Sequence, residues 1–211
     1  MKTRLIAVGL LAAFATGMAV AANKETSSTS EAEKTFRSSF RSDNPGYWMK
    51  RLDQDETMAL CSKYKNAPPK NVKLKIERDQ MATIRYPVEG KLIGDWREGE
   101  KLASSGKGGH IGFIQPDPPG TARGGNCYAC HQMSPKEVAY GTIGPSLKHF
   151  AKTRGNSEEI VKYVYDKVYN SNAFTACTNM PRIGYNNWLT PEQITHIVAY
   201  VLDPESPVNQ E

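Results

Sequence analysis

The sequence predicts a mainly α-helical protein, in which a small helical domain over residues 86–208 follows an N-terminal extension. Two observations support this prediction. Apolar residues recur at helical spacing in three segments of the domain, and residues that start or stop helices bound these segments. The window "CYACH", residues 127–131, gathers two of the chain's four cysteines and one of its four histidines. We therefore expect helices built around one chemical site.

Residues 1–21 have the pattern of an export signal. Two basic residues precede an apolar stretch over residues 5–20, and small residues at 19–21 are suited to cleavage. A membrane anchor is the alternative, but this stretch of 16 residues is short for a span, and no later segment is apolar enough. We expect a periplasmic protein that begins near Ala22 and has no membrane span.

The charge balance indicates neither nucleic acid nor a lipid surface as a partner. The chain has 27 Lys and Arg against 22 Asp and Glu, a net charge of +5. Without the two basic residues of the export signal the excess falls to +3. This is too small for strong binding to a polyanion.

The extension over residues 22–85 is poor in apolar residues. It opens with the low-complexity stretch "ETSSTSEAE", which we expect to be disordered. A helix is predicted around residues 53–64, with Met58 and Leu60 facing inward and an end before Pro68. About 60 residues of this composition bury too little surface for a separate core. We expect an arm that packs on the helical domain or on a partner.

The domain begins and continues with two predicted helices. Residues 91–106 carry apolar residues near helical spacing, and Gly106 stops the helix. Gly99 lies inside this segment, where a glycine permits the close approach of another helix, here the last one. Residues 157–170 form a second helix that starts at Ser157. A further short helix is expected directly after the cysteine window.

The last predicted helix, residues 190–203, has the clearest boundaries. Thr190 is the N-cap, Pro191 takes the first helical position, and Gln193 completes a capping box. Pro204 ends the helix. Its apolar residues recur at i, i+3, i+4 and i+7, so one face must be buried.

The spacing of Cys127, Cys130 and His131 is the attachment pattern of a c-type haem. A redox dithiol and half of a zinc site are the alternatives. A zinc site requires a second pair of ligands, yet Cys61 and Cys177 are each isolated in the sequence. A thioredoxin-like dithiol belongs in a βαβ unit, whereas this window follows a loop rich in Pro and Gly. We expect one covalently bound haem c.

We expect His131 to fill one axial position of the haem iron, and the ligand at the other axial position decides the chemistry. Met133 is too close to His131 in the chain, and His196 lies within the capped helix. His149 stays open as a candidate. Met180 is favoured, because it lies in a long polar loop and precedes Pro181. His/Met ligation leaves no open iron position and suits electron transfer, so no catalytic residue is assigned. A haem enzyme such as a peroxidase would need an open position.

Cys61 and Cys177 remain after the haem pair is assigned. An even remainder in an oxidising compartment predicts a disulfide between them. The alternatives are a free, buried Cys61 and a reactive Cys177.

The segment "GTIGPSL" resembles the class I cytochromes c, in which the proline carbonyl of a glycine-proline segment supports the proximal histidine. That resemblance places Pro145 beside His131. The series "GDWREGEKLA", "GGNCYACHQ", "GTIGPSL", "MPRIG", "LTPEQITHIVAYVLDP" and "PVN" resembles more narrowly the SoxX family, the small haem subunits of periplasmic SoxAX complexes. It covers roughly residues 86–208. The resemblance implies haem attachment at Cys127 and Cys130, with His131 and Met180 as axial ligands.

The SoxX resemblance also implies partners and a reaction. A SoxA-like cytochrome would form a heterodimer with this chain, and the complex would couple thiosulfate oxidatively to a cysteine of the SoxYZ carrier. This chain would pass electrons to a downstream small cytochrome c. It would be the electron-transfer subunit of an L-cysteine S-thiosulfotransferase complex, and the sulfur chemistry would belong to its partner. The alternative is a free-standing mono-haem cytochrome that shuttles electrons between respiratory complexes.

Overall fold

The computed structural model describes residues 31–39, 53–108, 117–118, 121 and 123–211. The chain divides into two compact units, and every predicted site residue lies in the larger one, residues 54–110 and 117–211. The predicted export signal, residues 1–21, lies outside the described residues. In the smaller unit residues 31–38 are helical, so the expectation of disorder was wrong for residues 31–33 of the low-complexity stretch.

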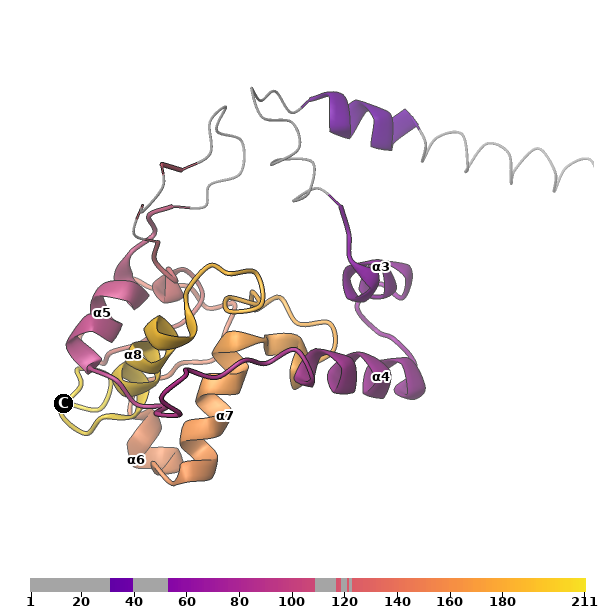
Figure 1. Cartoon of the computed structure of the whole chain (residues 1–211). Helices are drawn as coiled ribbons and strands as arrows, with labels where there is room; N and C mark the ends of the chain where they lie inside the picture. Colours follow the sequence, from indigo (N-terminus) through magenta and orange to yellow (C-terminus); the bar gives the residue numbers. More distant parts are fainter. Residues whose placement is uncertain (1–30, 40–52, 109–116, 119–120, 122) are drawn as a thin grey trace, which may run out of the picture. The chain divides into compact units, whose positions relative to one another are not determined.

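The core is built on the crossing of two helices, α5 (Trp96–Ser104) and α8 (Pro191–Leu202) (Figure 1). A Cβ atom added at Gly99 would overlap the carbonyl oxygen of His196, so the two backbones touch at this point. The predicted close approach is therefore confirmed. α5 begins later than expected, at Trp96, and the carboxylate of its N-cap Asp95 accepts a hydrogen bond from the Arg97 N–H at 2.8 Å. The capping box of α8 is present as predicted.

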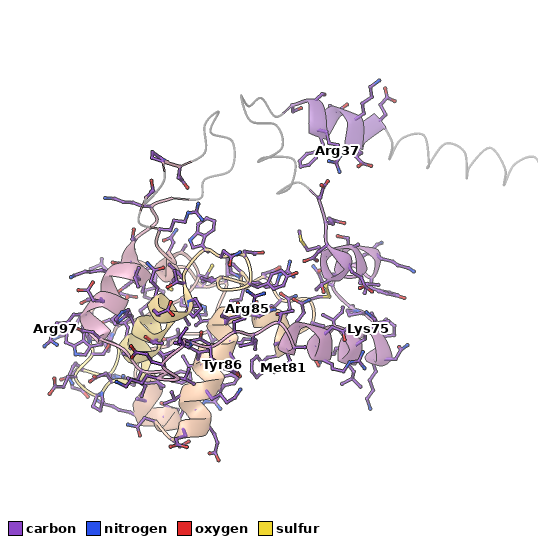
Figure 2. All side chains as sticks on the ribbon, in the orientation of Figure 1. Arg37, Lys75, Met81, Arg85, Tyr86 and Arg97 are labelled. Carbon is purple, nitrogen blue, oxygen red and sulfur yellow. A yellow bond between two sulfur atoms is a disulfide. The ribbon has the colours of Figure 1, made fainter. Side chains whose placement is uncertain are left out.

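Two further helices complete the core. α7 (Glu158–Tyr169) and α6 (Phe150–Arg154) both contact α8. Tyr165 of α7 is fully buried, and its hydroxyl donates to the Arg85 carbonyl oxygen at 2.8 Å. Figure 2 labels Arg85 and Tyr86 where the segment before α5 passes α7, and the Tyr86 and Tyr165 rings lie 5.4 Å apart. The segment that contains Arg85 and Tyr86, between the extension and α5, thus packs on the core.

The cysteine window forms a short 3-10 helix, η1 (Cys127–Ala129). The short helix expected directly after the window is not there, and residues 131–149 are irregular. The backbone groups of this stretch bond instead to the window itself: the Gly141 N–H donates to the Tyr128 carbonyl and the Gly144 N–H to the Cys130 carbonyl, both at 2.8 Å. A helix would have used those donors internally.

The extension contributes two helices, α3 (Glu56–Lys63) and α4 (Lys70–Met81). α3 agrees with the predicted helix, but Met58 is 42% exposed, so its inward placement was wrong. Thr57 and Cys61 face the interior instead. α4 was not predicted, because half of its residues are charged and it has no side-chain N-cap. Its buried Ile76 forms a small second core with Cys61 and Ala176.

None of the helices in the described ranges combines the length and the apolar character that crossing a bilayer demands.

The contact between α5 and α8 gives a first prediction. Gly99→Ala should lower the free energy of unfolding by about 1–3 kcal/mol, because the new methyl group must push the two backbones apart. Urea denaturation followed by circular dichroism measures this. The control is Ser104→Ala on the exposed face of α5, which should stay within about 0.5 kcal/mol of the original chain. Equal stability of both variants would show that the helices do not depend on this contact.

Candidate haem-binding site

Cys127, Cys130 and His131 come from one tight turn. The Cys127 carbonyl accepts hydrogen bonds from the N–H groups of Cys130 at 3.1 Å and His131 at 2.9 Å. The backbone just before the turn is bonded to the end of α5, since the Gly125 N–H donates to the Leu102 carbonyl at 2.8 Å. The turn therefore has a fixed place relative to the helix crossing.

The two cysteines of the turn are half-buried and carry free thiols. Burial raises the pKa of the Cys127 thiol to about 12, and the neighbouring Cys130 adds to the shift. This burial disfavours the charged thiolate form of Cys127. Among the described residues, no three His, Cys, Asp or Glu side chains lie close enough to hold a metal ion. The described residues therefore supply no further ligands for the closed four-ligand site of a structural zinc ion.

The imidazole of His131 is held in one tautomer. Its Nδ1 atom lies 2.7 Å from the carbonyl oxygen of Pro145. A carbonyl oxygen can only accept, so in the neutral ring the proton lies on Nδ1 and the lone pair on Nε2. An imidazole in this form binds a metal through Nε2, and the carbonyl partner fixes its orientation. A Cβ atom added at Gly144 would overlap the same ring, so the backbone there also restrains it.

The other candidate ligands have different surroundings. His196 accepts a hydrogen bond from the Asp95 N–H at Nδ1, at 2.9 Å, and so joins α8 to the start of α5. Met133 is 1% exposed and part of the main core. His149 precedes α6, and its buried Nδ1 has no hydrogen-bond partner among the described residues. Its backbone N–H donates to the Val208 carbonyl at 2.7 Å.

Met180 lies in the irregular loop between α7 and α8 and is half-buried. Both of its backbone groups are bonded: its N–H donates to Thr178 Oγ1 at 3.1 Å, and its carbonyl accepts from the Ser171 hydroxyl at 2.5 Å. At the base of the loop, the Tyr169 carbonyl accepts from the Gly184 N–H at 3.0 Å. This hydrogen bond joins the chain before Met180 to the chain after it.

The end of this loop lies against the segment that precedes the cysteine turn. The Trp188 indole N–H donates to the Gly124 carbonyl at 2.6 Å. Ile183 is a buried member of the main core, and Cys127 packs against the same cluster. The structure therefore brings the Met180 loop and the cysteine turn onto one core.

A disulfide joins Cys61 of α3 to Cys177 of the Met180 loop, with Cα atoms 5.5 Å apart. Sequence reasoning missed the buried polar residues beside it. The Gln80 side-chain oxygen accepts from Asn170 Nδ2 at 3.0 Å and from Arg182 Nη1 at 3.1 Å. No local pattern marks these residues, because the partners are far apart in the chain.

Comparison with known proteins gives two matches. Residues 121–203 match the family model for cytochrome c, and this span includes the cysteine turn, Pro145 and Met180. An uncharacterized lipoprotein of Aquifex aeolicus (strain VF5) is 40% identical over 158 residues, which is 74% of this chain and 73% of that protein. Neither match bears on sulfur oxidation.

The packing of Gly144 on His131 gives a second prediction. Gly144→Ala should displace the imidazole and lower the free energy of unfolding of the haem-loaded protein by about 1–3 kcal/mol, with a changed electron paramagnetic resonance spectrum of the ferric iron. Thr142→Ala, an exposed position in the same segment, is the matched control. A spectrum and stability equal to those of the control would contradict the role given to this contact.

Proposed function

Because the chain belongs to the cytochrome c family, we propose that it binds one haem c through Cys127 and Cys130, with His131 and Met180 as axial iron ligands, and transfers electrons. The proposal applies to a cytochrome domain over residues 86–208. The observation that supports it most directly is the hydrogen bond from His131 to Pro145, because it leaves Nε2 free for iron.

The residues of this chain have separate tasks in the proposed site. The bound haem supplies one-electron chemistry. The thiols of Cys127 and Cys130 tether it, and the carbonyl of Pro145 keeps His131 in the ligating tautomer. Met180 would offer its uncharged thioether as the second iron ligand, which would exclude small ligands and raise the reduction potential. Such a site relays electrons and does not activate a substrate.

We place the protein outside the cytoplasm, in the periplasm. The export pattern of residues 1–21 supports this placement. Covalent attachment of haem c in an oxidising compartment agrees with a chain that also carries a disulfide. The relative from Aquifex aeolicus is named a lipoprotein, which supports a location in the cell envelope.

We further propose that this cytochrome is the electron-transfer subunit of a SoxAX-like complex. A SoxA-like cytochrome would be its partner, the complex would couple thiosulfate to a cysteine of a SoxYZ-type carrier, and electrons would leave to a small cytochrome c. The support is the combination of sequence motifs over residues 86–208. The chain itself would not handle sulfur, because its four cysteines are used for the haem and the disulfide.

Substitution of the proposed sulfur ligand tests the ligation. In Met180→Ala, the sulfur-to-iron charge-transfer band of the ferric protein should vanish and the ferrous protein should bind carbon monoxide at neutral pH. The midpoint potential should fall by a sizeable part of the roughly 0.8 V range that axial ligands span. Met133→Leu is the matched control, because Met133 is a buried core residue. An unchanged spectrum and potential in Met180→Ala would refute His/Met ligation.

Reduction of the haem by thiosulfate tests the assignment to sulfur oxidation. The haem should become reduced only when a SoxA-like cytochrome and a SoxYZ-type carrier are both present, and the SoxA-like protein should co-purify with this chain. Reduction by thiosulfate alone would contradict the subunit role. A stable monomer without such a partner would favour the free-standing shuttle.

A further inference from the structure

The arm, residues 54–83 with α3 and α4, contacts the loop that carries Met180. We propose that the arm is a positioning device for the Met180 sulfur, which holds the loop closed and so keeps competing ligands from the iron. This inference rests on the proposed His/Met ligation. The contacts between the end of α4 and η2 (Ser171–Ala173), the start of the loop, are where the two segments meet (Figure 1).

α3 reaches the immediate surroundings of Met180. A cavity of about 240 Å³ is lined on one side by Thr57, Met58 and Cys61 of α3, and on the other by Met180, Pro181 and Arg182. The arm is therefore next to the proposed ligand itself, and not only next to distant parts of the loop.

Gln80 of α4 is the centre of the contact. It is 7% exposed, and both polar atoms of its side chain are hydrogen-bonded. Its oxygen accepts from Asn170 at the start of the loop and from Arg182 two residues past Met180, while its nitrogen donates to Thr57 Oγ1 of α3 at 3.1 Å. The Gln80 amide thus holds the two segments of the loop that flank Met180, and it joins them to both arm helices.

Arg182 makes this contact costly to break. Its side chain is 8% exposed, and its Nη2 atom lies 2.7 Å from Asp55 Oδ2, at the N-cap of α3. The guanidinium carbon lies 4.5 Å from the centre of the Tyr185 ring. A buried cation needs its partners, because an unpaired charge in the interior is strongly unfavourable. Opening of the loop would remove Arg182 from Asp55 and Gln80 together.

Two further contacts hold the tip of the loop. The Cys61–Cys177 disulfide ends three residues before Met180. The Ala176 N–H donates to Glu77 Oε1 of α4 at 3.3 Å, and the Ala176 side chain is buried with Ile76. The arm therefore contacts the loop before and after Met180, through a covalent bond and through hydrogen bonds of buried polar groups.

The consequence is a shift in the population of open loops. An external ligand reaches the iron only when the sulfur has left, so its apparent affinity scales with the open fraction. Loss of the hydrogen bonds to a charged group such as Arg182 should raise that fraction by about tenfold to a hundredfold.

The experiment measures imidazole binding to the ferric, haem-loaded full chain by visible absorption. Gln80→Leu keeps the packing volume and removes the amide, and it should bind imidazole about tenfold or more tightly than the original chain. Gln80→Glu keeps an acceptor for Asn170 and Arg182 and should restore weak binding. Arg78→Gln, on the exposed face of the same helix, removes an exposed salt bridge to Asp79 and should change the affinity by less than about twofold.

A second variant guards against misfolding of the first. The double variant Cys61→Ser with Cys177→Ser removes the disulfide and leaves every Gln80 partner in the sequence, and imidazole should again bind more tightly. Equal affinity in all variants would overturn the positioning role, even where urea shows lower stability. Failure of the proposed function would give a different result. The original chain would then lack the sulfur-to-iron band, and Met180→Ala would bind imidazole no more tightly than the original chain.

Discussion

The backbone contact between α5 and α8 is the constraint on which the rest of the site depends. It exists because Gly99 has no side chain to separate the helices. The end of α5 receives the hydrogen bond of Gly125, which sets the place of the cysteine turn. The start of α8 follows the Met180 loop, whose end is bonded to Gly124 through Trp188. One helix crossing therefore fixes the attachment points of both halves of the site.

The two proposed iron ligands are held by different means. His131 is restrained locally, by a carbonyl and a glycine from the segment that follows it along the chain. Met180 is restrained from a distance, by helices that precede its loop by about a hundred residues in sequence. This division gives the protein a proximal side that is part of the family's domain and a distal side that is supported by a segment outside residues 121–203, the span matched to the cytochrome c family.

Local patterns predicted the parts of the fold that local forces determine. The Thr190 capping box and the helical spacing after it gave α8, and Gly99 indicated a close helix contact. α4 escaped prediction because its stability comes from a few buried positions, Ile76 and Gln80, among charged neighbours. The Gln80 network could not be predicted, since its hydrogen bonds join residues 90 and 102 positions apart. The irregular segment after the cysteine turn likewise depends in part on hydrogen bonds to the turn, which no local sequence pattern indicates.

The raised pKa of Cys127 affects how the chain matures. Four cysteines allow several wrong pairings, and thiol–disulfide exchange proceeds through the thiolate. Burial raises the pKa of Cys127, so the fold disfavours its reactive thiolate form. A thiol that resists deprotonation exchanges slowly with the Cys61–Cys177 disulfide, which favours retention of the native pairing in the folded chain.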